Sequence, residues 1–320
     1  FCSNGVIGHA AESNAPPHTI VIGRVGSYCG SVYFSEHASW VTDNAIKAEA
    51  RSGNNPRFLF YLLQSLGLNS WRTGSGQPLL NQAILSSIRA GIPEEGEQRR
   101  IAKILGDLDD KIELNRTMNE TLEAMARALF KSWFVDFDPV RAKMEGRLPE
   151  GMDAETAALF PDRLVESELG MIPEGWEVGV LDDLIGLAIG GDWGSTDPTD
   201  VETVSCYCIR GADSPELQNG GSGQMPTRFL KPSSVEKRKL DDGDLAIEIS
   251  GGSPTQSTGR PVLASHALLK RLAQPLVASN FCRIVKLKKK VLARYVYLWL
   301  KGIYDAGELF QYETGTTGIK

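Results

Sequence analysis

One long amphipathic stretch, residues 93–137, constrains the fold of this chain more than any other feature. Its apolar side chains recur at alternating steps of three and four residues, which is the spacing of one stripe on an α-helix. The stripe consists of Ile101, Leu105, Leu108, Ile112, Leu122, Ala126, Leu129 and Trp133, with Asn115 and Asn119 at its two middle positions. A buried amide in such a seam weakens packing but fixes register and partner number. We therefore predict a helix that lies along one particular partner.

Both ends of this predicted helix are marked in the sequence. Pro93 precedes an acidic first turn of Glu94, Glu95 and Glu97, which suits the positive end of a helix dipole. The dipeptide Asp138-Pro139 prevents the helix from continuing. A helix of this length is a rod of roughly 60 Å and can act as a spacer. On the pattern alone, an ordinary core or coiled-coil helix is the more usual interpretation.

Composition narrows the class of protein. The 320 residues suffice for two domains, and no apolar run is long enough to predict a membrane span. The net charge is −6, yet residues 94–178 carry 20 acidic and 11 basic side chains, which leaves a mild basic excess on the flanks. This fits two modules that approach a polyanion. The five cysteines are scattered and form no C-x-x-C motif, which predicts reduced thiols in a cytoplasmic protein.

An internal repeat indicates two related domains. Four pairs of segments occur in the same order at an offset of about 225 to 240 residues, which favours duplication. The pairs are 18–34 with 240–252, 41–45 with 277–281, 58–66 with 295–303, and 72–79 with 313–319. The fold class predicted is α+β, with two similar domains joined by a long coiled-coil-type helix. The predicted divisions are residues 1–92 for the first domain, 93–137 for the helix, 138–172 for a linker with a helical piece at 154–160, and 173–320 for the second domain.

Local patterns place elements in the first domain. We predict a strand at 40–46, a short helix at 56–68 and a last strand at 83–88 that leads into the long helix. The first copy has no counterpart of Pro173-Glu-Gly-Trp176, and the second reaches Lys320 before a final strand and a second long helix. We therefore expect the chain to be truncated at both ends.

Four motifs connect the chain with a known family. They are residues 97–105 (EQRRIAKIL), 108–115 (LDDKIELN), 118–137 (MNETLEAMARALFKSWFVDF) and 172–177 (IPEGWE). With the duplicated domains, they resemble the DNA-specificity subunit of Type I restriction-modification systems. The resemblance implies that each globular domain recognises one half of a split DNA site and that the helix sets the distance between the halves. It also implies a non-catalytic subunit that carries methyltransferase and motor-nuclease subunits. We expect no cofactor and no membrane partner.

The physical dimensions agree with this implication. At about 3.4 Å per base-pair step, a rod of roughly 60 Å corresponds to about 17 steps of duplex DNA. Two readers at its ends would contact two short sequences with an unread gap between them. In the family a second long helix packs antiparallel to the first, and this chain does not contain one. We expect the uncovered stripe to make the chain associate or depend on a partner protein.

Candidate DNA contacts are polar side chains on Gly-Ser loops, where the backbone can also approach a phosphate. In the first domain they are Ser3, Asn4, Arg24, Ser27, Tyr28, Thr73 and Gln77. In the second domain they are Arg228, Ser250, Ser253, Gln256, Arg260 and Thr316. Ordinary surface turns are the alternative interpretation for each of these residues. The basic run 286–290 is typical of a solvated strand end, with phosphate contact as the alternative.

Catalytic and scaffolding functions are the alternatives to DNA recognition. A methyltransferase would need an Asn/Asp-Pro-Pro-aromatic motif, and Asn55-Pro56 lacks the second proline. A metal-dependent nuclease would need a lysine beside its carboxylates, which Asp244 and Glu248 lack. No phosphate-binding P-loop motif occurs, and four dispersed histidines predict neither zinc nor a triad. The other rival is a scaffold whose helix docks a partner, and such a scaffold would not bind duplex DNA with a steep salt dependence.

Overall fold

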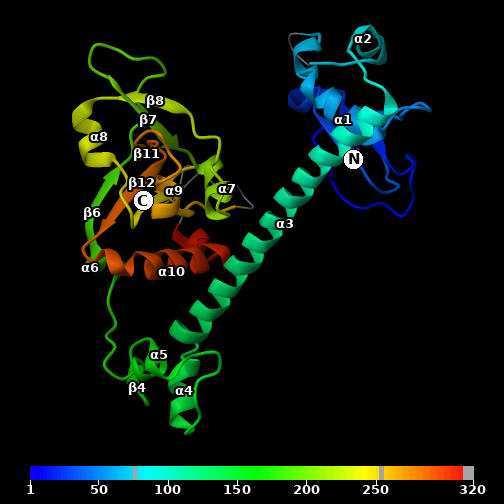
Figure 1. Ribbon diagram of the computed structural model, residues 1–320. Helices are drawn as coiled ribbons and strands as arrows, with labels where there is room; N and C mark the ends of the chain where they lie inside the picture. Colours follow the sequence, from blue (N-terminus) through cyan, green and yellow to red (C-terminus); the bar gives the residue numbers. More distant parts are fainter. Residues whose placement is uncertain (75–77, 252–255, 313–320) are drawn as a thin grey trace. The chain divides into compact units, whose positions relative to one another are not determined.

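The computed structural model describes residues 1–74, 78–251 and 256–312 (Figure 1). It forms two compact units, Phe1–Asn115 and Arg116–Lys320, and each is described by itself. The helix α3, Glu95–Phe134, is one continuous helix of 40 residues that runs through the boundary. The predicted long helix is therefore confirmed to within a few residues at either end. None of the described helices is both long and apolar enough to cross a membrane.

The first unit is built on a three-stranded antiparallel sheet. β1, Thr19–Gly23, lies between β2, Val32–Ser35, and β3, Ala45–Ala48. Helix α1, Pro56–Ser65, packs on this sheet and starts at the Asn55 side chain, which accepts the Phe58 N–H. The apolar residues of β1 fill the core, because all five β1 residues are buried. The buried cluster on the α1 side consists of Ile20, Ile22, Cys29, Leu68 and Leu80.

Two predicted strands of this unit need correction. The strand predicted at 40–46 begins only at Ala45, because Val41 is paired in both directions with the Asn14 side chain instead of a neighbouring strand. The strand predicted at 83–88 is wrong. This segment is helix α2, Gln82–Ser87, whose first turn is capped by the Asn81 side chain accepting the Ile84 N–H. The remaining short elements are the 3-10 helices η1, Gly26–Tyr28, and η2, Leu68–Trp71.

The start of α3 is fixed to the first unit by a face other than the predicted stripe. Its buried residues are Gln98, Ala102 and Gly106, spaced one turn apart. Gly106 allows the Arg57 guanidinium to lie against the helix, because a Cβ there would be 3.0 Å from its central carbon. Arg57 also pairs with Asp110 at 3.0 Å. The stripe residues Ile101 and Leu105 are half-buried, whereas Leu108 and Ile112 are exposed.

The end of α3 is fixed to the second unit by aromatic side chains. Phe137 adopts a left-handed backbone conformation with φ 58°. A new helix, α4, follows it and spans Asp138–Met144. α3 thus ends at Phe134, before the predicted stop at Asp138-Pro139, and Pro139 lies in the first turn of α4. Phe134 contacts Trp176 at 6.2 Å and Tyr295 at 5.4 Å between ring centroids. The cluster consists of Phe130, Trp133, Phe134, Phe137, Phe160, Trp176 and Tyr295.

The segment predicted as a linker contains regular structure. The helical piece expected at 154–160 is α5, Ala154–Ala158, capped by the Asp153 side chain. It is followed by an antiparallel hairpin of β4, Leu164–Ser167, and β5, Gly170–Pro173. The ion pair between Arg163 and Glu174 joins the two ends of this hairpin. The hairpin was missed because its four-residue strands carry little periodic signal.

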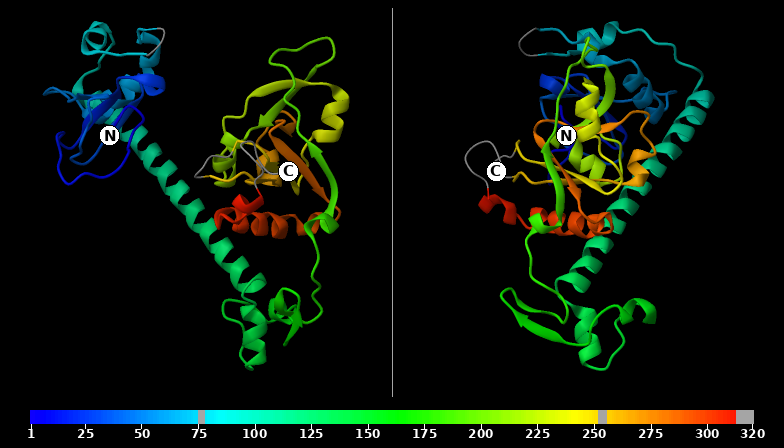
Figure 2. Two further views of the ribbon diagram at one scale, coloured as in Figure 1. Left: turned by 180° about the vertical axis from the view of Figure 1, so that it is seen from behind. Right: turned by 90° about the vertical axis from the view of Figure 1, so that its left-hand side faces the viewer.

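Within the described residues, the second domain has two sheets, and Figure 2 shows this domain from two further sides. The larger has the order β10-β9-β12-β6 and is antiparallel throughout. Its strands are β6, Ile185–Gly190, β9, Asp244–Glu248, β10, Pro261–Ala264, and β12, Cys282–Leu287. The smaller has the order β11-β7-β8, with β7, Val204–Ile209, β8, Thr227–Leu230, and β11, Leu276–Ala278. The helices are α6, Leu181–Leu184, η3, Gly211–Asp213, α7, Ser214–Gln218, α8, Pro232–Arg238, α9, His266–Leu269, η4, Lys290–Leu292, α10, Ala293–Asp305, and η5, Glu308–Tyr312.

The two domains share one arrangement in their later parts. β2-β1-β3 in the first corresponds to β10-β9-β12 in the second, with the same order and antiparallel directions. Each is followed by a helix, α1 or α10, and then a 3-10 helix, η2 or η5. This supports the internal repeat. The repeat's last segment, 313–319, lies outside the described residues.

Candidate nucleic-acid interface

The first domain presents its predicted contacts on the connection between β1 and β2. Arg24, Ser27 and Tyr28 are exposed, and 55% of Tyr28 is accessible. The Arg24 guanidinium lies 3.5 Å from the carbonyl oxygen of Asp43. A guanidinium, a hydroxyl and a phenol thus share one short exposed loop, which suits contact with phosphates and base edges.

The other predicted residues of this domain divide between surface and interior. Asn4 and Thr73 are exposed, and Thr73 Oγ1 lies 3.4 Å from the Leu79 carbonyl oxygen. Gln77 lies outside the described residues. Ser3 is buried, so we no longer place it among the DNA contacts. Its hydroxyl donates to the Asn44 carbonyl and accepts the N–H groups of Arg24 and Val25 at 3.2 Å each, and so holds the base of the exposed loop.

Arg228 in the second domain also has an internal role. It is buried and donates to the carbonyl oxygens of Trp193 and Gly194 at 2.9 and 3.0 Å. A third bond of 2.7 Å reaches Thr196 Oγ1, and the guanidinium lies 4.4 Å from the centre of the Trp193 ring. These contacts use the guanidinium's donors to order the segment after β6. The predicted DNA contact of Arg228 is therefore replaced by a structural one.

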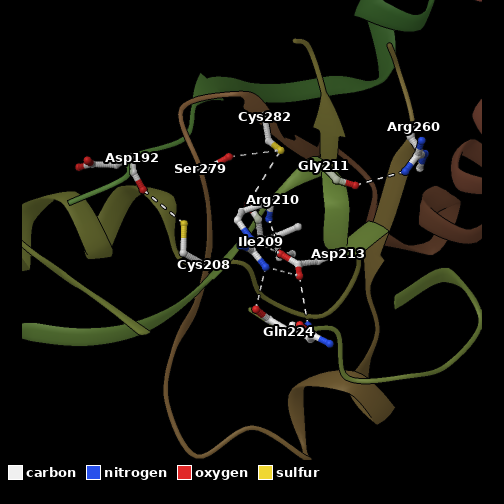
Figure 3. A network of polar contacts seen from close by, with 10 residues as sticks. All are labelled: Asp192, Cys208, Ile209, Arg210, Gly211, Asp213, Gln224, Arg260, Ser279 and Cys282. Carbon is white, nitrogen blue, oxygen red and sulfur yellow. Dashed lines mark hydrogen bonds and ion pairs between the residues drawn. The ribbon is translucent and has the colours of Figure 1, made fainter. Parts of the chain in front are cut away.

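Arg260 is a second buried arginine at a predicted DNA position. Its Nε donates to the Tyr304 hydroxyl at 3.1 Å. Its Nη1 donates to the Gly211 carbonyl oxygen at 3.2 Å, a bond that Figure 3 shows. The Glu248 carboxyl is nearby, and its burial raises its pKa although Arg260 opposes that shift. Arg260 thus attaches the end of the β9–β10 connection to α10 and η3. We withdraw it from the DNA contacts for the same reason as Arg228.

An arginine that sequence reasoning missed lies beside this connection. Arg210 forms a bidentate pair with Asp213, with Nε 2.9 Å from Oδ2 and Nη2 3.0 Å from Oδ1 (Figure 3). Asp213 is only 2% exposed, whereas 40% of the Arg210 side chain is accessible. Arg210 also donates to the Gln224 carbonyl oxygen at 2.8 Å. A guanidinium held rigidly at the surface by a buried carboxylate is well suited to a phosphate. The sequence signal was the Arg-Gly-Ala-Asp turn directly after β7.

The remaining predicted positions are less informative. Ser250 and Gln256 are half-buried at either end of the β9–β10 connection, and Ser253 and Thr316 lie outside the described residues. The basic run 286–290 is engaged locally, since Lys286 pairs with the buried Asp244 at 3.0 Å and Lys288 donates to the Asp183 carbonyl oxygen at 2.8 Å. This agrees with a strand-end interpretation of the run.

Burial perturbs several titratable groups of the second domain, among them its three thiols. Burial raises the pKa of Cys206 and Cys282 to about 11 and that of Cys208 to about 12. Such thiols stay protonated and are poor nucleophiles at neutral pH. Within the described ranges, no group of three or more His, Cys, Asp or Glu residues is placed to hold a metal ion. The exposed side chains among the predicted contacts of both domains are hydrogen-bond donors and acceptors, which suits them to binding.

Comparison with known proteins finds similarity to one class of protein. Residues 2–124 match the family described as Type I restriction modification DNA specificity domain. Curated proteins that are similar to this chain are specificity subunits of Type I restriction enzymes, the family that the sequence motifs resemble. It is 36% identical to the HindI specificity subunit of Haemophilus influenzae over 43% of this chain and 33% of that protein. It is 23% identical to the MjaVIII specificity subunit of Methanocaldococcus jannaschii over 91% of this chain and 62% of that protein.

One solved structure aligns with most of the chain at low identity. The S subunit of a Type I restriction-modification system from M. genitalium aligns over 97% of this chain and 70% of that one. The identity is 14% and the TM-score is 0.47. The matched region covers about a third of the length of the HindI subunit.

Proposed function

We propose that this chain is a DNA-specificity subunit of a Type I restriction-modification complex, in which each domain reads one half of a bipartite DNA site. The main support is the match of residues 2–124 to the specificity-domain family, together with a second domain of the same sheet order after α3. The proposed contacts are the exposed residues Asn4, Arg24, Ser27, Tyr28 and Thr73 of the first domain, with Ser250, Gln256 and the newly found Arg210 of the second.

We propose that α3 sets the spacing between the two half-sites. Its 40 residues correspond to roughly 60 Å along the axis. A spacer must be fixed to the domain at either end. Gln98 and Arg57 supply that attachment to the first unit, and the aromatic cluster around Phe134 supplies it in the second.

We further propose that the apolar stripe of α3 docks the methyltransferase subunits, through which the motor-nuclease subunits are carried. Four of its leucine and isoleucine side chains are about half exposed or more: Leu108 53%, Ile112 49%, Leu122 56% and Leu129 47%. Exposed apolar side chains in a row along one helix are typical of a protein interface. The subunit itself would contribute recognition and no catalytic residue.

The DNA-binding proposal is tested by selection from randomised duplex DNA with the assembled complex. We expect an enriched sequence in two short parts separated by an unread gap, and binding that weakens steeply as salt rises. Arg24→Ala should weaken binding and Arg210→Ala should do so at the other half-site. Arg163→Ala, at an ion pair in the β4–β5 hairpin, is the matched control. An unenriched pool would refute the proposal.

The docking proposal has its own test. Ile112→Glu should reduce co-purification with the methyltransferase subunit, because it places a charge in the apolar stripe. Thr117→Glu is the control, since Thr117 is exposed on the other side of α3. Equal recovery of the partner with both variants would contradict docking through this stripe.

A further inference from the structure

The two domains carry different side chains at one matching position of their sheets. In the first domain, the Arg24 N–H donates to the Asn44 carbonyl oxygen at 3.0 Å, which continues the β1–β3 register by one residue. In the second, the Ile249 N–H donates to the Phe281 carbonyl oxygen at 2.9 Å and continues the β9–β12 register in the same way. Side chains directly opposite each other on antiparallel strands lie on the same face. A guanidinium and an amide are therefore paired in one domain, and two apolar side chains in the other.

Phe281 is the exposed member of the apolar pair. It is 56% exposed, whereas Ile249 is half-buried beneath the position directly before Ser250, a proposed DNA contact. Arg24 and Asn44 are both exposed at the matching position of the first domain. Single exposed apolar side chains are common on protein surfaces. The position of Phe281 therefore matters more than its exposure, because an aromatic ring stands where the other domain presents an amide.

Phe281 also lies close to the newly found contact at the end of β7. It belongs to the turn between β11 and β12, in which the Cys282 N–H donates to the Ser279 carbonyl oxygen at 2.9 Å. The Ser279 N–H donates to the carbonyl oxygen of Ile209, directly before Arg210, also at 2.9 Å. Figure 3 shows Ser279 and Cys282 next to Ile209 and Arg210. The turn thus lies between the Arg210 side chain and the β9–β10 connection.

The backbone of this turn is held on several sides. The Gly191 N–H donates to the Cys282 carbonyl oxygen at 2.9 Å, and the Asp192 N–H donates to the Ala278 carbonyl oxygen at 2.9 Å. With the bonds from the ends of β7 and β9, three further segments of the domain fix the turn. An aromatic side chain on a rigid backbone loses little conformational freedom when it binds. Phe281 is therefore preorganised for contact at this surface.

We propose that Phe281, supported by Ile249, reads a thymine of the second domain's half-site through the 5-methyl group of that base. Apolar side chains distinguish thymine from the other bases by contact with this methyl group in the major groove. At the matching position of the first domain, Arg24 and Asn44 read hydrogen-bonding base edges, because a guanidinium pairs with guanine and an amide with adenine. This role rests on the proposed DNA recognition and adds to it one specificity-determining position in each domain.

The test uses the assembled complex and the duplex selected from the randomised pool. Every thymine on either strand of both half-sites is replaced in turn by uracil, which lacks only the 5-methyl group. We expect one replacement to weaken binding by the unmodified complex about fourfold, the factor for burying one methyl group. Phe281→Ala and Phe281→Asn should bind the thymine and uracil duplexes equally. Val291→Ala, at an 86% exposed position beyond the other end of β12, is the control and should keep the preference.

Each result separates this role from DNA recognition as such. A thymine preference that disappears in both Phe281 variants and persists in the control supports the proposal. Uracil tolerated at every position would overturn it, and so would a thymine preference that survives Phe281→Ala. Uracil tolerance with weaker binding by Phe281→Ala would show a ring that stacks on bases, which is a different role. A pool without enriched half-sites would refute DNA recognition itself, and this role with it.

Discussion

Replacing Gln98 by leucine should loosen the junction between α3 and the first domain. The Gln98 side chain is 1% exposed and accepts the Asn55 N–H at 2.8 Å. Its amide donates to the Pro93 carbonyl oxygen at 2.9 Å and to Asn54 Oδ1 at 3.2 Å. One side chain thus joins the helix to the loop that starts α1 and to the segment that precedes α3.

The loss of stability can be estimated from the hydrogen-bonding groups that the substitution leaves without a partner. Leucine removes the partners of the Asn55 N–H and the Pro93 carbonyl, and each buried group left without a hydrogen bond costs about 1 to 3 kcal/mol. The buried leucine returns about 1 to 2 kcal/mol through its larger apolar surface. We expect a net loss of about 2 to 4 kcal/mol from the stability of this junction.

Hydrogen exchange followed by mass spectrometry measures the stability of this junction locally. A local measurement is needed because a chain of two units need not unfold in one step. Peptides that cover Asn54 to Phe58 and the first turns of α3 should exchange faster in Gln98→Leu, with the second unit unchanged. Gln64→Leu, at an exposed position of α1, is the control and should stay within about 0.5 kcal/mol of the parent. A Gln98→Leu chain as protected as the control would refute the argument.

Further predictions concern thiols, glycines, pH and association. Cys2 should be the one thiol that iodoacetamide labels quickly in the native chain, because hydrogen bonds, chiefly from the Thr42 side chain, lower its pKa. Burial raises the pKa of the others, and mass spectrometry should find them labelled only after unfolding: Cys29, Cys206, Cys208 and Cys282. Gly30→Ala should destabilise the first unit by more than 2 kcal/mol in urea denaturation, well beyond Gly53→Ala at about 1 kcal/mol. Both glycines have positive φ, but only a Cβ at Gly30 would meet backbone, at 2.4 Å. Burial raises the folded pKa of Glu248, so its contribution to stability is present below its unfolded pKa of about 4.5 and is lost as pH rises through the folded value. Glu248→Gln should remove this decline, and denaturation midpoints that fall equally with pH in both chains would contradict it. The isolated chain should self-associate through the α3 stripe at high micromolar concentration. A monomer by light scattering would contradict that.

The elements that sequence reasoning predicted are those with a long or repeated signal. The stripe from Ile101 to Trp133 persists over many turns, so α3 was located closely. The internal repeat predicted that both domains have their sheet and helix in the same order, because the same weakly similar segments occur in the same order in both copies. Helix α2 was predicted as a strand because Ile84 and Leu85 form a short apolar run, and only the Asn81 cap distinguishes the two structures.

The candidate site was harder to predict than the fold. Arg228 and Arg260 look like surface cations in the sequence, yet their partners lie more than 30 residues away along the chain. Such partners are brought together only by the tertiary fold. The same holds for Ser3, which bonds to Asn44 and to the backbone of the loop it supports. The Gly-Ser turns correctly indicated that Arg24 and Tyr28 are exposed on a short loop.

The central claim is that α3 holds two DNA-reading domains at a fixed separation. Its most direct test inserts about seven residues of helix-forming sequence between Asn115 and Arg116, which lengthens the rod by about 10 Å and preserves the phase of its stripe. Selection from randomised duplex with the assembled complex should then return the same two half-sites with a gap longer by about three base pairs. Half-sites recovered with an unchanged gap would contradict the claim.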